Sequence, residues 1–195
     1  TEAVVFGALA GGNAADYAKN EPLPEFNKDQ VDWYRKQIYQ PLTRNDGFDI
    51  FETRKKLQYL AFKYLGPLRE ESGLTTCLEE VEKMDREVLP NMATTIKGKI
   101  CNREWVVALE NQALLFVLET VARSSLMRKE SRGAMYRRDY PDTDNRDWLK
   151  NIIVKEKDGK VNLEIRPVVT TSRIKLPERK KIPYMIPTWK FDKRM

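Results

Sequence analysis

The sequence predicts a mainly α-helical protein: a three-helix up-down bundle of the spectrin-repeat kind, with a preceding helix and a C-terminal β-hairpin plus extended arm. Apolar residues recur at helical spacing along three consecutive segments between residues 50 and 130. Short runs typical of strands follow after Pro141, on either side of a turn-forming Asp-Gly pair. The last 23 residues contain three prolines, too many for a helix or a central strand.

The chain begins with a stretch of small and apolar residues at 2–19, which predicts a single helix. Gly7, Gly11 and Gly12 each cost such a helix about 1 kcal/mol relative to alanine, so we expect them to permit close packing against another backbone. Their spacing, and their position within a helix, do not match a dinucleotide-binding fingerprint. We therefore expect a detached helix whose glycine-rich face lacks its full partner in this chain.

A linker bounded by prolines at residues 21–25 leads to a short amphipathic helix, predicted at residues 27–40. A turn-rich break is predicted from residue 41 to residue 48. The bundle follows, with helices predicted at about residues 50–68, 74–88 and 102–130.

The third predicted bundle helix is apolar around much of its circumference, which is typical of a central helix. Leu115, Phe116 and Leu118 are therefore expected to include fully buried positions. Gly133 suits the position just past the helix end, after three cations that complement the helix dipole: Arg128, Lys129 and Arg132.

Two runs after the bundle read as strands, at residues 151–155 and 160–166. Asp158 and Gly159 between them form a good two-residue hairpin turn. The sequence therefore predicts a β-hairpin here.

The composition excludes several classes of enzyme. The 195 residues contain no histidine, which removes Ser-His and Cys-His nucleophiles, histidine general bases and most zinc and iron sites. Cys77 and Cys101 are too few for a Cys₄ zinc site or a disulfide framework, and we expect both to be inert, reduced thiols. No apolar run reaches the about 18 uninterrupted residues of a membrane span.

The net charge of +6 belongs entirely to the last 23 residues, since the other 172 carry 27 cations and 27 anions. This arm, Arg173 to Met195, mixes its cations with apolar and aromatic side chains. We expect it to lie along a protein surface with Trp189 as an anchor. The alternative is a free-standing helical interaction module that binds nucleic acid or an acidic partner through this basic tail.

An acid-rich loop at residues 139–147 suggests calcium at first sight. Measured against the EF-hand loop it lacks glycine at the sixth position, and Ile153 stands where the twelfth position needs glutamate. Interspersed arginines can neutralise its aspartates. A salt-bridged loop with helix-capping aspartates is the preferred interpretation.

The densest pattern of the chain carries a family resemblance. It contains Ser131-Arg132-Gly133 after the long helix, then Asp139-Tyr140-Pro141 and Trp148-Leu149-Lys150. Together these resemble the C-terminal helical domain of the succinate dehydrogenase/fumarate reductase flavoprotein family. Three further stretches are similar in order and spacing: residues 1–12, 57–74 and 111–125. Met135 stands where that family usually has histidine, which leaves the subfamily open among succinate dehydrogenase, fumarate reductase, adenylylsulfate reductase and aspartate oxidase types.

The resemblance implies the function of a larger parent protein. That parent is expected to be an FAD-dependent oxidoreductase for succinate and fumarate, or a close relative, with an iron–sulfur electron-transfer partner. The flavin-binding and catalytic residues of the family precede the point that matches Thr1. The resemblance therefore implies that this chain holds no catalytic, cofactor-binding or metal residue and binds no FAD by itself.

The resemblance also implies a domain organisation. Residues 1–20 are expected to end the FAD-binding domain, and residues 21–48 to form a linker with a short helix. Residues 49–150 are expected to form the C-terminal three-helix domain, followed by the hairpin and basic tail at 151–195. Expected partners are the upstream FAD-binding and capping domains and the iron–sulfur subunit, or a second copy of the chain in isolation. Nucleic acid is not an expected partner under this interpretation. The expected location is cytoplasmic, with the parent held peripherally on the cytoplasmic face of the membrane through partner subunits.

Overall fold

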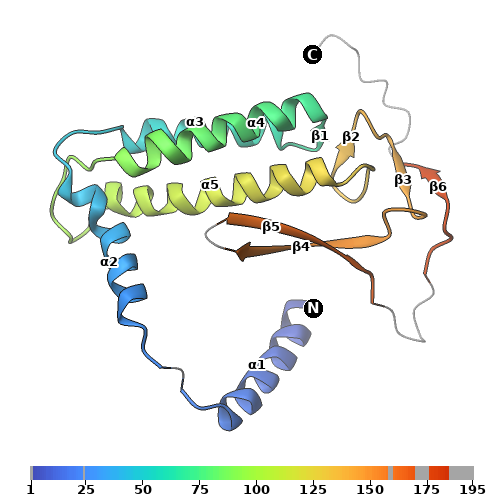
Figure 1. Cartoon of the computed structure of the whole chain (residues 1–195), viewed down its shortest axis with the longest axis horizontal. Helices are drawn as coiled ribbons and strands as arrows, with labels where there is room; N and C mark the ends of the chain where they lie inside the picture. The colour runs from blue at the N-terminus through green and yellow to red at the C-terminus, as the bar shows by residue number, and fades with distance from the viewer. Residues whose placement is uncertain (1, 24, 158–159, 170–175, 185–195) are drawn as a thin grey trace. The chain divides into compact units, whose positions relative to one another are not determined.

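The computed structural model describes residues 2–23, 25–157, 160–169 and 176–184. The chain divides into two compact units, residues 1–38 and residues 39–195 (Figure 1). Helix α2 (Lys28–Thr43) begins in the first unit and ends in the second. The predicted mainly α fold is confirmed.

The first unit contains helix α1 (Glu2–Asn20), which matches the helix predicted at residues 2–19. The side chains of residues 3–20 are all exposed. A Cβ atom added at Gly7, Gly11 or Gly12 would meet no other atom within 4 Å. Within the described residues of the first unit, the glycine-rich face therefore has no packing partner.

Three helices of the second unit form the predicted bundle: α3 (Ile50–Tyr64), α4 (Glu71–Lys83) and α5 (Arg103–Met127). Helices α3 and α4 lie along α5 in Figure 1. Polar caps start two of them, since the Asp49 carboxylate accepts from the Glu52 N–H at 2.7 Å and the Asn102 amide oxygen accepts from the Trp105 N–H at 3.0 Å. Helix α4 continues as a π-helical turn, η1 (Met84–Val88), and a 3₁₀ turn, η2 (Leu89–Asn91).

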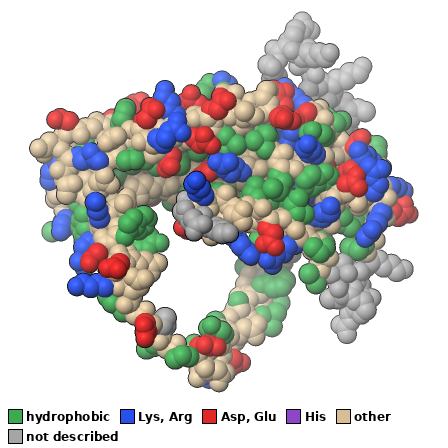
Figure 2. Space-filling model, viewed as in Figure 1, with side chains coloured by type: hydrophobic (Ala, Val, Ile, Leu, Met, Phe, Trp, Pro, Cys, Tyr) green, Lys and Arg blue, Asp and Glu red, His purple; other side chains and the backbone are tan. Residues whose placement is uncertain are grey.

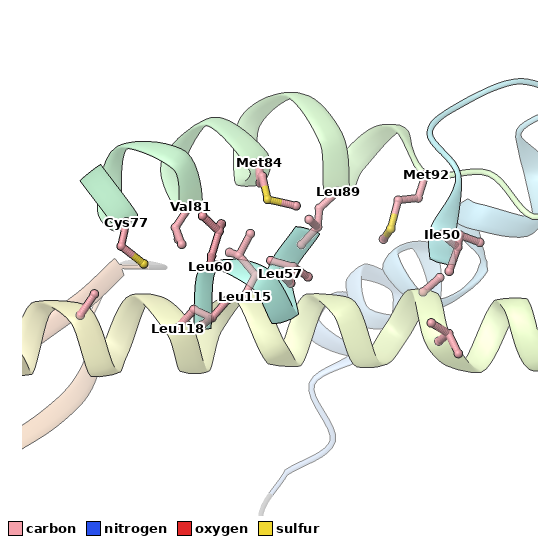
Figure 3. Packing of buried hydrophobic residues seen from close by; sticks show 13 residues of the cluster. Ile50, Leu57, Leu60, Cys77, Val81, Met84, Leu89, Met92, Leu115 and Leu118 are labelled. Carbon is pink, nitrogen blue, oxygen red and sulfur yellow. The ribbon is translucent and has the colours of Figure 1, made fainter. Parts of the chain in front are cut away.

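The core fills the space between the three helices and the turns after α4 (Figure 3). Its buried members are mostly aliphatic: Ile50, Leu57, Leu60, Cys77, Val81, Met84, Leu89, Met92, Val107, Ala108, Leu115, Leu118 and Ala122. Helix α5 faces both α3 and α4, as expected of a central helix. By length and composition alone α5 also passes for a membrane span, but its buried face accounts for part of that apolar character.

The expectation that Leu115, Phe116 and Leu118 include buried positions is confirmed at Leu115 and Leu118, but Phe116 is not one of them. Leu115 and Leu118 are 4% and 2% exposed, whereas Phe116 is 47% exposed. Consecutive residues lie about 100° apart around a helix, so the face that buries Leu115 turns Phe116 away from the core. The apolar character of this helix is therefore not a guide to burial at each position.

Several helix boundaries differ from the prediction, among them the C-terminal ends of α2 and α5. Helix α2 runs on through Pro41 to Thr43, and Pro41 is buried with its carbonyl accepting from the Thr94 N–H at 3.0 Å. Helix α5 ends at Met127, because Arg128 already has an extended backbone.

The prediction that Gly133 follows the helix end is therefore wrong. Gly133 lies in a two-residue turn between Arg132 and Met135, whose backbone groups exchange two hydrogen bonds. Its φ of +62° is the left-handed conformation that glycine adopts without strain. The glycine does mark a left-handed backbone position, but that position belongs to a turn and not to a helix cap.

The predicted hairpin is confirmed as β4 (Lys150–Lys157) paired antiparallel with β5 (Lys160–Pro167). Its predicted Asp-Gly turn lies outside the described residues. Two further pairs were not predicted: β1 (Leu68–Arg69) parallel to β2 (Tyr136–Arg137), and β3 (Asp142–Asp144) antiparallel to β6 (Lys181–Pro183). Strands of two or three residues are too short to show an alternating pattern.

Candidate functional site

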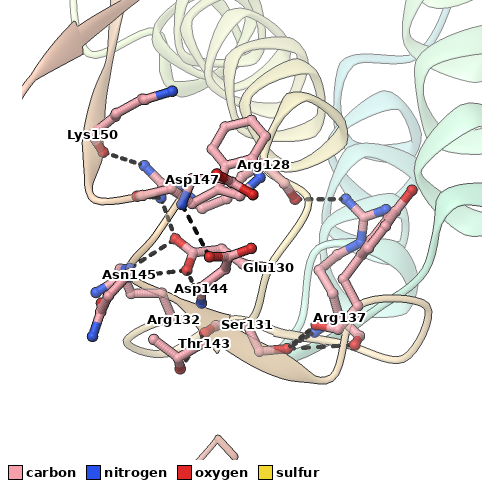
Figure 4. A network of polar contacts seen from close by, with 12 residues as sticks. Arg128, Glu130, Ser131, Arg132, Arg137, Thr143, Asp144, Asn145, Asp147 and Lys150 are labelled. Atoms are coloured by element: carbon pink, nitrogen blue, oxygen red, sulfur yellow. Dashed lines mark hydrogen bonds and ion pairs between the residues drawn. The ribbon is translucent and has the colours of Figure 1, made fainter. Parts of the chain in front are cut away.

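The loop that follows α5, residues 128–150, holds the densest polar network of the described chain (Figure 4). It contains the run on which the family resemblance rests. Strands β2 and β3 belong to this loop and attach it to β1 and β6. Two of its charged side chains, those of Glu130 and Arg137, are completely buried.

The Glu130 carboxylate is held by cations and by a backbone N–H. Arg132 donates to it from Nε at 2.7 Å and from Nη2 at 2.9 Å, and the backbone N–H of Asp144 donates at 2.8 Å. Arg128 donates to the same carboxylate and also to the carbonyls of Trp148 and Lys150. A buried carboxylate needs this full set of partners, because an unpaired charge in the interior is very costly.

The Arg137 guanidinium closes the C-terminal end of α5. It donates to the carbonyls of Ser125 and Arg128, which have no partner inside the helix. It also donates to both carboxylate oxygens of Asp139, from Nε at 2.7 Å and from Nη2. One buried cation therefore joins the end of α5 to the loop.

Asp139 extends this connection to α4, because its carboxylate also accepts from the Glu71 N–H at 3.1 Å. Burial acts to raise the pKa of Asp139, but the hydrogen bonds and charge of Arg137 outweigh burial and lower it. Arg137 and Asp139 together therefore connect the ends of two bundle helices.

Ser131 and Asp144 shape the loop backbone. The Ser131 hydroxyl accepts from the Arg137 N–H at 2.8 Å and donates to the Tyr140 carbonyl at 2.8 Å. The Asp144 carboxylate accepts from the N–H groups of Arg146 and Asp147, both at 3.0 Å. Burial acts to raise the pKa of Asp144, yet these two N–H groups and Lys181 lower it.

The salt bridges expected in the acid-rich loop are confirmed, but Asp144 caps a turn and not a helix. Asp139 pairs with Arg137, Asp147 pairs with Arg146, and Asp144 caps the backbone after it. Within the described residues, no group of three or more His, Cys, Asp or Glu side chains is placed to hold a metal ion.

Arg69 belongs to the same network, although the sequence offered no signal for it. Its guanidinium donates to the carbonyls of Leu65 and Gly66, both at 2.8 Å, and to the Ser125 hydroxyl at 2.5 Å. Burial and the nearby charge of Arg137 lower the pKa of Arg69. Only the folded chain brings residue 69 beside residue 125, because they lie on different elements.

The cysteines predicted to be inert lie far from this loop in sequence and differ in exposure. Cys77 is fully buried on α4, and burial raises the pKa of its thiol to about 11. Cys101 is exposed, just before α5. The structure therefore supports an unreactive thiol at Cys77.

The described part of the basic arm contacts its own protein. Strand β6 pairs with β3, Lys181 Nζ lies 3.5 Å from an Asp144 carboxylate oxygen, and the Tyr184 hydroxyl donates to the Gly133 carbonyl. Figure 2 shows cations and anions intermixed over the visible face, not separated into a basic stripe. Trp189, the expected anchor, lies outside the described residues.

Comparison with known proteins agrees with this architecture. Residues 54–181 match the family model described as the fumarate reductase flavoprotein C-terminal domain. The chain belongs to this family. The match includes the three bundle helices, the polar loop and the hairpin.

The relatives of this family member are flavoproteins. The chain is 30% identical over 154 residues to an uncharacterized FAD-dependent oxidoreductase of Methanocaldococcus jannaschii, covering 78% of the chain and 27% of the relative. It is also 30% identical over 178 residues to the fumarate reductase flavoprotein subunit of Mycobacterium tuberculosis, covering 87% of the chain and 30% of that subunit. The chain thus spans less than a third of the length of these relatives.

Solved structures of such proteins share this fold over a part of their length. The Sdh1 complex of Mycobacterium smegmatis matches with a TM-score of 0.73 at 27% identity, over 84% of this chain and 28% of that one. A solved quinol–fumarate reductase with menaquinol molecules shares the fold. Its TM-score is 0.76 at 24% identity, over 89% of this chain and 30% of that one.

Proposed function

We propose that this family member is the C-terminal portion of an FAD-dependent enzyme that interconverts succinate and fumarate. The chain contributes structural support and a docking surface, and the flavin and the catalytic groups belong to the upstream part of the same protein. The observation that carries the proposal is the loop after α5. Its charged groups, Glu130, Arg137 and Asp139, are engaged in holding helix ends together, which suits a structural part of an enzyme.

The proposed domain organisation follows the family. Residues 1–20 end the FAD-binding domain, residues 21–48 are a linker, residues 49–150 form the C-terminal domain, and residues 151–195 form the hairpin and tail. The exposed, glycine-rich α1 supports this division, because an apolar helix without a core of its own needs a partner.

The docking surface is the outer side of α5 between Val106 and Val117. Val106, Phe116 and Val117 are each about half exposed there, on the side of the helix that does not face the core. Large apolar side chains grouped on a surface mark interaction sites. The proposed partners are the upstream FAD-binding and capping domains and an iron–sulfur subunit, which hold the parent on the cytoplasmic face of the membrane.

The test uses the full-length parent protein. It should carry FAD and oxidise succinate with an artificial electron acceptor, or reduce fumarate with a reduced dye. A parent without flavin and without either activity would contradict the proposed enzyme.

A variant pair tests the docking role separately. Val117→Glu should weaken packing of the C-terminal domain in the parent, seen as faster cleavage of the linker by protease and lower flavin content. Thr75→Glu, at an exposed position of α4, is the matched control and should leave both unchanged. Equal rates of linker cleavage and equal flavin content in the two variants would mean that α5 is not part of the docking surface.

A further inference from the structure

A pocket of about 470 Å³ opens beside the C-terminal half of α5 and the first residues of β4. This volume lies within the range of about 300–1,000 Å³ that is usual for small-molecule sites. Seven of the residues that line it are polar: Arg69, Thr120, Ser124, Ser125, Arg128, Arg132 and Asn151. Its α5 residues lie between Thr120 and Ser125, C-terminal to the proposed docking surface.

The surroundings of this pocket carry more positive than negative charge. Arg128 and Arg132 share the single carboxylate of Glu130, and Arg137 takes the carboxylate of Asp139. Arg69 has only neutral acceptors, two carbonyls and one hydroxyl. Four guanidinium groups therefore share two carboxylates, and those of Arg128 and Arg137, with side chains 15% and 0% exposed, lie where burial makes charge expensive.

Hydrogen-bond donors also remain unused at the pocket. A guanidinium has five N–H groups. Arg69 uses three of them, and Arg132 donates from Nε and Nη2, so Nη1 is left over among the described residues. The Thr120 hydroxyl is one of two buried side-chain polar atoms in the described chain that lack a hydrogen-bond partner. Buried polar atoms without partners are rare and call for a missing one.

We propose that this pocket binds a small anion with two negative charges, carried on carboxylates or on a phosphate. Planar guanidinium groups bind both kinds of group through paired N–H donors. Arg69 and Arg132 supply the donors, Thr120 supplies a hydroxyl, and the ligand balances the excess charge. The site is independent of the flavin chemistry proposed for the parent.

The test titrates the chain with malonate and with inorganic phosphate, and follows the amide NMR signals of residues that line the pocket. Malonamide, a neutral analogue of malonate, and KCl at matched ionic strength are the controls. We expect the amide signals to shift saturably with malonate or phosphate and not with either control. The anion that binds more tightly identifies the ligand chemistry. Shifts no larger than those produced by KCl would overturn the proposal.

A second arm changes the charge of the pocket without removing an arginine that supports the fold. Asn151→Asp places a carboxylate at the pocket rim, at an exposed position of β4, and should weaken anion binding by about tenfold or more. Asn162→Asp, at an exposed position of β5 outside the pocket lining, is the matched control. It should bind the anion as tightly as the unsubstituted chain of residues 1–195 does. Equal affinities of the two variants would place the anion elsewhere and overturn the assignment.

Discussion

Two completely buried charged side chains, Glu130 and Arg137, hold the polar loop against the end of α5. Each has enough partners to offset the cost of leaving water. Neither is placed to act on a ligand as an acid or a base. At the scale of the residue, the side chains of the run on which the family resemblance rests hold the loop against the ends of α5 and α4.

Replacing Arg137 by methionine should show this directly. Arg137→Met keeps an aliphatic side chain but leaves the carbonyls of Ser125 and Arg128 and the partly buried Asp139 carboxylate without their cation. The free energy of unfolding in urea should fall by about 2–4 kcal/mol. Arg138→Met, at a guanidinium that is 50% exposed, is the control and should change it by less than about 0.5 kcal/mol.

The same variant carries a pH signature. Because Arg137 lowers the pKa of Asp139 below its usual value near 3.8, the pair stabilises the folded chain above that pH. The stabilisation is lost as the pH falls through the lowered pKa. The difference between the wild type and Arg137→Met should therefore shrink below about pH 4, and a difference independent of pH would contradict the ion pair.

The two thiols should differ sharply in reactivity. With its pKa raised to about 11, buried Cys77 is almost entirely protonated at pH 8, whereas Cys101 is exposed. An aromatic disulfide reagent should label one thiol per folded chain and two after unfolding in urea. In Cys101→Ser, rapid labelling of the folded chain should disappear; persistence of a fast thiol would mean that Cys77 is accessible.

The candidate site was only partly predictable from the sequence. The pairing of aspartates with neighbouring arginines followed from their alternation along residues 137–147. The burial of Glu130 and Arg137 did not, because a run rich in charge is typical of a solvated loop. Burial arises when the loop folds back onto the end of α5 and its strand β2 pairs with β1, a contact between segments far apart in the sequence.

At the scale of the element, α5 organises the second unit. One side of it completes the core with α3 and α4, and its last turn is closed by Arg137. Its other side presents Val106, Phe116 and Val117 to the outside. The helix therefore supports both the core and the proposed docking surface.

Two side-chain truncations on α5 should distinguish the core side of the helix from its outer side by their effect on stability. Leu118→Ala removes a side chain that is 2% exposed and should cost about 2–5 kcal/mol of stability, from lost burial and the cavity left behind. Phe116→Ala, at 47% exposure, should cost less than about 1 kcal/mol in the isolated chain. Urea unfolding of both variants checks this, and equal losses would mean that the core is misplaced.

The basic arm should behave as part of the fold. Strand β6 pairs with β3, so the arm is already attached to the loop before any partner binds. We expect no submicromolar binding of single-stranded RNA or DNA at moderate salt, and a loss of stability or of partner affinity in Trp189→Ala. Tight nucleic-acid binding that weakens steeply with salt, with Trp189→Ala unaffected in both respects, would instead support the free-standing module.

The elements with many residues were predictable and the short ones were not. Helical spacing over 15 residues or more located α1, α3 and α5, and alternation around an Asp-Gly pair located the hairpin. Pairing of β1 with β2 and of β3 with β6 depends on contacts between distant segments of two or three residues. Such contacts leave no periodic pattern in the sequence.

At the scale of the whole molecule, the chain is one part of a larger assembly in this account. It spans 27–30% of the length of its relatives in Methanocaldococcus jannaschii and Mycobacterium tuberculosis. The exposed α1 and the outer side of α5 are surfaces that the remainder of such a protein would cover. The second unit has a hydrophobic core of its own.

The flavin content of two purified proteins tests the central claim most directly. Residues 1–195 alone should be colourless, because the account assigns FAD to the upstream part of the parent. The full-length parent should show flavin absorbance near 450 nm at about one FAD per chain. Stoichiometric FAD bound to residues 1–195 alone, or a full-length parent without flavin, would contradict the account.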